Sequence, residues 1–251
     1  MTTTRERASG ALTALGLPVR IRACLFDLDG VLTQTARLHA EAWKATFDPL
    51  LAAAASRRGE PYIPFDERGD YERYVDGRPR FDGVRAFLES RGIECDEAAV
   101  VAIGDRKNER VLARMQAGGV QAFAGSIRYL EAVRAAGLRR AVVSASVNCG
   151  AALEAAGLAG FFAVRIDGAR AADEALRGKP APDTFLAAAR ALQVTPAEAA
   201  VFEDALAGVS AGRAGRFGFV VGVDRTGHAD ALLRAGADVV VTDLAELLEP
   251  S

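Results

Sequence analysis

An apolar run that ends in two aspartates and a glycine constrains this chain more than any other feature. Residues 23–26 are apolar, Asp27 and Asp29 follow two positions apart, and Gly30 comes directly after them. Such a run fits a strand buried on both faces of a parallel sheet, with Asp27 at its carboxyl end, where open α/β sheets bind ligands. Gly30 allows a sharp turn that would bring both carboxylates to one point. Two converging carboxylates require a cation or a shared proton, although an acidic turn without a function would have the same sequence.

The composition limits the partners of the chain. With 251 residues, half of them hydrophobic, it can form one large domain or two modest ones. A formal net charge of −2 gives no electrostatic reason to expect nucleic acid or an anionic membrane as a partner. The three cysteines are widely spaced, which fits a reduced protein without disulfides or a zinc site. No apolar run is long enough to span a membrane, residues 1–10 lack an apolar signal core, and no partner surface is evident. We therefore expect a cytoplasmic monomer that acts on a small molecule.

Periodicity divides the chain into an α/β part and a helical insert. Apolar residues recur at three- and four-residue steps over residues 35–55, which is typical of a helix, and further helices are indicated near residues 84–88 and 111–115. The polar stretch over residues 57–74, with its prolines and glycines, is predicted to be a loop. No strand is predicted within the insert. The expected parts are a flexible tail over residues 1–20, a helical cap over 35–115, and a core formed by 21–34 and 116–251.

The remainder of the chain alternates between strands and helices. Strands are predicted over residues 22–27, 140–144, 161–165, 199–202, 217–223 and 238–241. Helices are predicted over residues 127–136, 149–156 and 182–192. Strands that alternate with helices of about ten residues indicate a parallel sheet. We therefore expect an α/β fold, a doubly wound parallel sheet with a Rossmann-like core and an inserted α-helical cap domain.

Polar side chains lie at several of the predicted strand ends or just beyond them. The four clusters are Asp27 with Asp29, Ser144 with Ser146, Lys179, and Glu203 with Asp204. The carboxyl ends of parallel strands share one edge of the sheet, so the clusters can meet in one crevice. Several carboxylates beside a lysine and a hydroxyl suit a hard cation, most simply Mg²⁺ together with a substrate phosphate. Taken singly, each cluster also has a structural explanation as a helix cap, a solvated lysine or acids at a helix start.

The same clusters, in the same order, resemble the four motifs of the haloacid dehalogenase-like phosphohydrolases. The matching segments are Asp27-Leu28-Asp29-Gly30-Val31, Val143-Ser144-Ala145-Ser146, Gly178-Lys179-Pro180 and Phe202-Glu203-Asp204. The helical insert after the first motif is similar to the small α-helical cap of that superfamily. Within the superfamily the chain resembles the β-phosphoglucomutase family. This closer similarity is carried by the first motif and by His39, Trp43, Gly77, Arg80, Arg106-Lys107-Asn108, Ser144-Ala145-Ser146 and Asn148.

The resemblance implies a role for each motif residue. Asp27 would be the nucleophile that takes the phosphoryl group, and Asp29 would be the general acid and base. Ser144 and the backbone amide of Ala145 would hold the phosphoryl oxygens, and Lys179 would offset the negative charge. The Mg²⁺ ligands implied by the resemblance are Asp27, Asp29 through its backbone carbonyl, Glu203 and Asp204.

A mutase must also hold a second phosphate, or the sugar ring, away from the metal. Arg80 is the best candidate because a guanidinium binds a phosphate through two donors, although a solvated arginine is the alternative. The other expected substrate-binding residues are Gly77, Arg78, Lys107, Ser146 and Asn148, with His39 coupling cap closure to Asp29 and Trp43 as a sugar platform. His39 and Trp43 could instead be a half-buried helix histidine and a core residue. Val147 stands where related mutases carry a lysine, so one contact to the distal phosphate is missing.

The family resemblance implies an Mg²⁺-dependent phosphosugar mutase that interconverts β-D-glucose 1-phosphate and glucose 6-phosphate. The reaction would pass through phosphorylated Asp27 and a glucose 1,6-bisphosphate intermediate. One alternative is a sugar-phosphate phosphatase, in which water attacks the same phosphoenzyme. A second alternative is a catalytically silent module that binds a phosphorylated metabolite, against which the complete set of motif residues argues. Arg80 favours the mutase, whereas Val147 weakens the substrate assignment.

Overall fold

Six parallel strands form the sheet of the core, and their carboxyl ends share one edge. The strands are β1 (Ala23–Phe26), β2 (Arg139–Val143), β3 (Val164–Ile166), β4 (Ala199–Glu203), β5 (Phe219–Val223) and β6 (Val239–Val241). In this computed structural model, which describes residues 12–248, their order is β3-β2-β1-β4-β5-β6. β1 lies at the centre, with Phe26 opposite Val142 of β2 and Phe202 of β4. The residues that follow β1, β2 and β4 therefore leave the sheet side by side.

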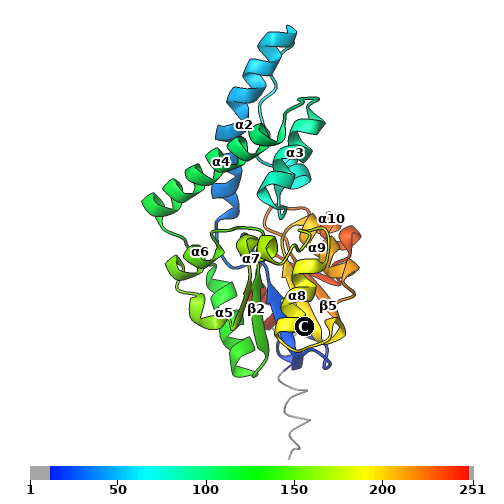
Figure 1. Cartoon of the computed structure of the whole chain (residues 1–251). Helices are drawn as coiled ribbons and strands as arrows, with labels where there is room; N and C mark the ends of the chain where they lie inside the picture. Colours follow the sequence, from blue (N-terminus) through cyan, green and yellow to red (C-terminus); the bar gives the residue numbers. More distant parts are fainter. Residues whose placement is uncertain (1–11, 249–251) are drawn as a thin grey trace, which may run out of the picture.

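Helices cover both faces of the sheet, so the core is doubly wound as predicted (Figure 1). The core helices are α5 (Ala124–Ala135), α6 (Cys149–Ala155), α7 (Gly168–Asp173), α8 (Asp183–Ala191), α9 (Leu206–Ala214) and α10 (Ala229–Ala235), with short 3₁₀ turns η2 (Ala159–Phe161), η3 (Pro196–Glu198) and η4 (Leu244–Leu248). On β1, Phe26 packs against Tyr129 of α5, whereas Leu25 enters the hydrophobic cluster that contains Phe185 of α8. Neighbouring side chains of one strand thus enter opposite layers, as the two-residue period of a strand requires.

A helical cap is inserted between β1 and α5, as predicted. It contains α2 (Ala36–Arg58), the π-helical turn η1 (Tyr71–Val75), α3 (Arg80–Ser90) and α4 (Glu97–Gly118), which stand above the carboxyl edge of the sheet in Figure 1. The cap has a hydrophobic cluster of its own, in which the ring centroids of Phe47 and Phe87 lie 4.2 Å apart and Phe65 packs against both rings. Because these aromatic side chains bury one another, the cap has an internal core separate from that of the sheet.

The predicted flexible tail over residues 1–20 is wrong for residues 12–17. Leu12, Leu15 and Leu17 are buried in the hydrophobic cluster on the α5 side of the sheet, and the Tyr129 hydroxyl donates to the carbonyl of Leu15 over 2.9 Å. Three leucines close together in the sequence supply an apolar surface, and its burial against the core stabilises this segment. The segment is too short to show a periodic pattern in the sequence. Residues 1–11 lie outside the described part of the chain.

Two local predictions also need correction. The stretch over residues 57–74 is not wholly a loop, because α2 continues to Arg58 and η1 begins at Tyr71. Tyr71 and Val75 are buried in the cap, and this burial stabilises a short turn that the polar composition of the stretch hides. The third strand begins at Val164, whereas Phe161 belongs to the 3₁₀ turn η2.

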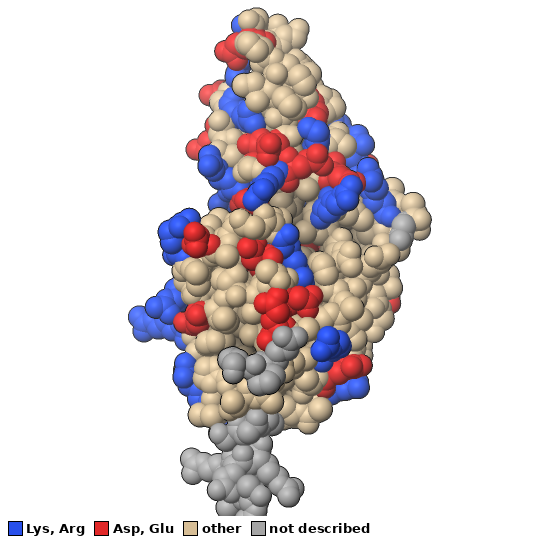
Figure 2. Space-filling view, turned by 180° about the vertical axis from the view of Figure 1, so that it is seen from behind, with Lys and Arg blue, Asp and Glu red and all other residues tan. Residues whose placement is uncertain are grey.

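The surface carries charges of both signs. On the face shown in Figure 2, basic and acidic side chains are interspersed, and neither sign covers a broad area. Such a face offers no electrostatic footprint for a polyanion. None of the helices formed by residues 12–248 is long and apolar enough to cross a membrane.

Candidate active site

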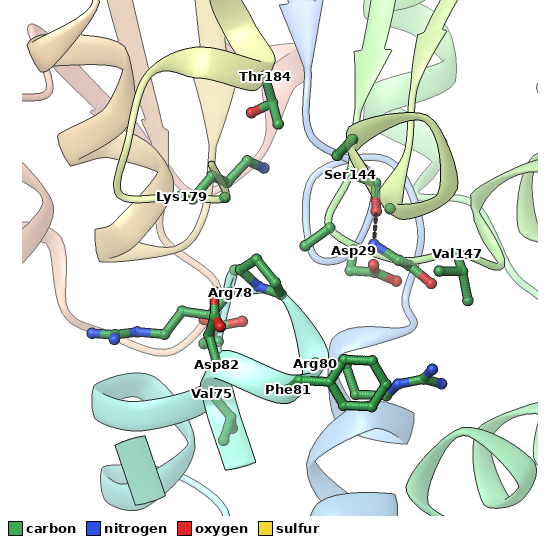
Figure 3. Close-up of a pocket in the computed structure, with 18 of the residues that line it drawn as sticks. Asp29, Val75, Arg78, Arg80, Phe81, Asp82, Ser144, Val147, Lys179 and Thr184 are labelled. Atoms are coloured by element: carbon green, nitrogen blue, oxygen red, sulfur yellow. Dashed lines mark hydrogen bonds between the residues drawn. The ribbon is translucent and has the colours of Figure 1, made fainter. Parts of the chain in front are cut away.

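A cavity of about 650 Å³ lies between the carboxyl edge of the sheet and the cap. Figure 3 shows Asp29, Ser144 and Lys179 on the core side of this cavity and Arg78, Arg80 and Phe81 on the cap side. The predicted site residues that line it are Asp27, Asp29, His39, Trp43, Gly77, Arg78, Arg80, Lys107, Ser144, Ala145, Ser146, Lys179 and Asp204. Glu203 is fully buried and Asn148 stands outside the lining, where its side-chain amide donates to Asn108 over 2.8 Å. The cavity therefore gathers residues that follow β1, β2 and β4 and residues of the cap. Lys179, predicted to lie near a strand end, comes instead from the loop between α7 and α8.

Lys179 links two of the acidic motifs. Its ammonium lies 2.5 Å from Asp27 Oδ1, forms an ion pair with Glu203, and donates to the carbonyl of Val143 over 3.1 Å. All three charged side chains are at least nine-tenths buried. Burial alone would lower the pKa of Lys179, but attraction by Asp27 and Glu203 raises it above its ordinary value. Lys179 therefore stays cationic beside the nucleophile position.

Three buried carboxylates gather at the same place. Asp27, Glu203 and Asp204 each offer an oxygen, and these oxygens lie within 4.8 Å of one another. The approach is close: a Cβ on Gly30 would lie 1.7 Å from Asp204 Oδ2, and the φ of Gly30 is +82°, so this position requires glycine. Burial, and then repulsion by Asp76 and Asp27, raises the pKa of Asp204 well above its usual range. A set of buried carboxylate oxygens fits a hard divalent cation such as Mg²⁺.

Asp27, Glu203 and Asp204, which we call the acidic cluster, and the neighbouring Asp76 should make the stability of the metal-free protein depend on pH. Burial raises the pKa of Asp27 to about 6, of Asp76 to about 7 and of Glu203 to about 8, in each case with a contribution from neighbouring carboxylates. In the unfolded chain these groups titrate near pH 4, so between about pH 4 and 8 the folded state holds more protons. The free energy of unfolding should therefore fall as the pH rises through this window.

Thermal unfolding in EDTA and in Mg²⁺, at pH values from 5 to 8, tests this expectation. Mg²⁺ should raise the melting temperature most at pH 8. A free Mg²⁺ concentration of 100 times Kd should increase the free energy of unfolding by about 2.7 kcal/mol. Asp204→Asn should remove most of the Mg²⁺ effect. If the metal-free protein became more stable between pH 5 and pH 8, the raised pKa values of these buried carboxyl groups would be contradicted.

The side chain of Asp29 belongs to a different set of contacts. It accepts a hydrogen bond from Thr35, and His39 Nε2 lies 3.6 Å from its Oδ1. Lys107 of α4 in turn lies 2.9 Å from His39 Nδ1. Burial raises the pKa of Asp29, whereas burial and the charge of Lys107 lower the pKa of His39 well below its usual range. The side chain of Asp29 therefore contacts cap residues instead of the carboxylates of Asp27, Glu203 and Asp204. This position suits a group that transfers a proton to or from a substrate.

Arg80 is the cap residue best placed to receive an anion. Its Nη2 lies 3.1 Å from Asp105, and its guanidinium carbon lies 4.8 Å from the centroid of the Phe81 ring. Its Nη1 is buried and, within residues 12–248, has no hydrogen-bond partner. A buried N–H group without an acceptor costs free energy that a bound anion would recover. Arg80 therefore has one donor committed to the cap and another available to a ligand.

The structure qualifies two of the predicted substrate contacts. Trp43 lines the cavity but is buried in the cap, stacked on Phe47 at 5.0 Å, with Lys107 4.8 Å from its ring centroid. Its packing therefore fits the core residue that the sequence also allowed. Gly77 has a φ of +67°, and a Cβ there would lie 2.9 Å from the Cβ of Ala205, so glycine lets the cap approach the core. Lys107, which contacts both the Trp43 ring and His39, is itself buried, and this burial lowers its pKa to about 7.

Several further polar residues of the site escaped the sequence analysis, among them the following three. Thr35 bonds to Asp29, and Asp76 and Tyr71 line the cavity beside the acidic cluster. Asp76 is the neighbouring charge with the largest effect on the pKa of Asp204. Thr35 follows the first motif closely enough to have been noticed, and Asp76 precedes Gly77 directly. Asp76 carries no signal in the local pattern, because it meets Asp204 only when the cap folds over the sheet.

The comparisons with known proteins agree with this geometry. The model of the haloacid dehalogenase-like hydrolases matches residues 21–216, so the chain belongs to that family. It is 56% identical over 246 residues to the β-phosphoglucomutase of Mycobacterium tuberculosis, covering 93% of this chain and 94% of that protein. It is 32% identical to the validoxylamine A 7′-phosphate phosphatase of Streptomyces hygroscopicus subsp. limoneus, covering 91% and 97%. The solved structure of a β-phosphoglucomutase from Clostridium difficile superposes with a TM-score of 0.73 at 27% identity, covering 90% and 93%.

Proposed function

We propose that this protein is an Mg²⁺-dependent β-phosphoglucomutase, interconverting β-D-glucose 1-phosphate and glucose 6-phosphate. The observation that carries the proposal is that one cavity has two anion-binding ends. Asp27, Lys179 and the acidic cluster lie at the core end, and the unpaired Nη1 of Arg80 lies at the cap end. A phosphatase needs only the first end, whereas a bisphosphate intermediate needs both. The 56% identity to a β-phosphoglucomutase supports the same choice.

The residues divide the reaction between them. Phosphorylated Asp27 donates its phosphoryl group to the 6-hydroxyl of β-glucose 1-phosphate, and Asp29 accepts the hydroxyl proton. After the bisphosphate turns round, Asp27 attacks the phosphorus at C1, the bond to the sugar oxygen breaks, and Asp29 returns the proton to that oxygen. Lys179 and Ser144 hold the phosphoryl oxygens during both transfers. Mg²⁺, held by Asp27, Glu203, Asp204 and the Asp29 carbonyl, would offset the charge that otherwise repels a carboxylate from a phosphate.

The cap decides whether the phosphoenzyme transfers to sugar or to water. A closed cap excludes water from phosphorylated Asp27, which preserves it for the second transfer. The 32% identity to a validoxylamine A 7′-phosphate phosphatase keeps hydrolysis as the second candidate. The silent binding module is disfavoured, because Asp27, Lys179 and Asp204 keep a complete reactive arrangement. We further propose that the protein works as a monomer in the cytoplasm, with residues 35–115 as its cap.

Arg80→Ala separates the two ends of the cavity. It should reduce glucose 6-phosphate formation from β-glucose 1-phosphate about 100-fold, since a buried charge-assisted contact to phosphate is lost. Hydrolysis of a generic aryl phosphate, which engages only the core end, should change less than about threefold. Arg80→Lys should restore little, because an ammonium lacks the two-donor fork. Equal losses in both assays would assign Arg80 to folding of the site and remove the main support for the mutase.

A further inference from the structure

A loop after β5, held by hydrogen bonds to one aspartate, connects the cap to the acidic cluster. Asp224 accepts hydrogen bonds from the backbone N–H groups of Thr226, Gly227, His228 and Ala229, over 2.7–3.1 Å. The side chain of Asp224 is 8% exposed. One carboxylate therefore holds four successive amides, which fixes the shape of the loop over residues 224–228. In Figure 1 the chain between β5 and α10 rises toward the cap.

The cap binds this loop through η1 and the residues before it. Arg68 donates to the carbonyl of Thr226 over 2.6 Å, and the Thr226 hydroxyl donates to Glu72 Oε1 over 3.0 Å. Glu72 Oε1 also lies 3.5 Å from His228 Nδ1. Arg68 and Glu72 are themselves paired at 3.7 Å, so the cap presents both charges as one unit. These contacts join residues more than 150 positions apart in the chain.

The same loop holds the backbone of both acid-bearing strand ends. His228 Nε2 donates to the carbonyl of Asp204 over 3.2 Å. Arg225 Nε donates to the carbonyl of Gly30 over 2.9 Å. Gly30 and Asp204 are the pair whose close approach requires a glycine. The loop therefore touches the two backbone segments that set the spacing of the carboxylates.

We propose that Glu72, Thr226 and His228 form a clasp that couples the closed position of the cap to the geometry of the acidic cluster. The clasp rests on the proposed function, because it treats that cluster as the Mg²⁺ site. When the cap is closed, Glu72 holds Thr226 and His228, and His228 holds Asp204 at the position that cation binding needs. When the cap opens, the loop loses its cap partner, water reaches Asp27, and the acidic cluster loses part of its support. Glu72 and His228 are positioning residues in this scheme.

Two variants separate the halves of the clasp. Glu72→Ala removes the cap half, and we expect the phosphate released per glucose 6-phosphate formed to rise about fivefold, because exposed charge networks contribute modestly. Amide hydrogen exchange over residues 71–76 should become faster. Glu72→Gln keeps an acceptor for Thr226 and should restore most of the wild-type ratio. Glu97→Ala, which breaks the 2.5 Å ion pair with Arg85 elsewhere in the cap, is the matched control and should leave the ratio unchanged.

His228→Ala removes the core half. Calorimetry should show Mg²⁺ binding weakened about tenfold, whereas His228→Gln, whose amide can still donate to Asp204, should stay within about threefold of the wild type. The proposed metal site itself would be refuted if the wild-type protein bound no Mg²⁺, or if the Asp204→Asn variant bound Mg²⁺ with the same affinity as the wild type. Wild-type protein with Asp204-dependent binding, combined with unchanged affinity in His228→Ala and an unchanged phosphate ratio in Glu72→Ala, would overturn the clasp alone.

Discussion

Asp27→Asn is expected to lower glucose 6-phosphate formation at least about 1,000-fold, since an amide cannot form the acyl phosphate that the reaction requires. The variant should bind the sugar phosphate, because Arg80 and the rest of the cavity remain. Acid-quenched wild-type enzyme incubated with labelled bisphosphate should retain label on the peptide that contains Asp27. The same peptide of the variant should carry none.

An exposed aspartate provides the control for this substitution. Asp173 lies at the end of α7, outside the cavity, and Asp173→Asn should match the wild type in both rate and labelling. Residual turnover of Asp27→Asn above about one per cent of the wild-type rate would show that another group takes the phosphoryl. Asp29 is the neighbouring carboxylate that such a result would implicate.

Lys179→Ala is expected to cost about 3–5 kcal/mol of the free energy of unfolding, since it leaves Asp27 and Glu203 buried without their cation. The loss should be greater at pH 8 than at pH 5, because the two carboxyl groups can escape the penalty by keeping their protons only at the lower pH. Urea unfolding at both pH values measures the effect.

The double variant Lys179→Ala, Glu203→Gln tests the cause of that loss. Neutralising Glu203 removes one of the two stranded charges, so the double variant should be more stable than Lys179→Ala at pH 8. A single variant that loses less than about 1 kcal/mol, or a double variant that is less stable still, would show that Lys179 does not neutralise the buried acids.

Much of the site follows from the sequence because it lies at strand ends. Asp27 and Glu203 come directly after apolar runs of four residues, with Asp204 next to Glu203, and Ser144 follows the three apolar residues that end β2. Parallel strands place such positions at one edge of the sheet. Lys179 was grouped with the strand ends, but it lies in a loop between α7 and α8, and the family resemblance supplied its specific role. The fold of the core was predictable for the same reason as the strand ends: alternation is a local signal.

The cap was predictable as a helical block but not in its contacts with the core. Asp76 and Glu72 find their partners across the interface between cap and core, and the periodicity of one segment does not report the position of another. The π-helical turn at Tyr71–Val75 also has no pattern of its own, because burial of Tyr71 against the cap stabilises it within a polar stretch. The clasp and the contacts of His39 and Lys107 around Asp29 could therefore be identified only from the structure.

The most direct test of the mutase is a single assay that follows both products. β-Glucose 1-phosphate, Mg²⁺ and a trace of glucose 1,6-bisphosphate are supplied, and glucose 6-phosphate and free phosphate are measured together. The cavity with two anion-binding ends predicts glucose 6-phosphate in large excess over phosphate, with the bisphosphate required for full rate. Phosphate released without glucose 6-phosphate would contradict the mutase for this sugar and make the protein a phosphatase.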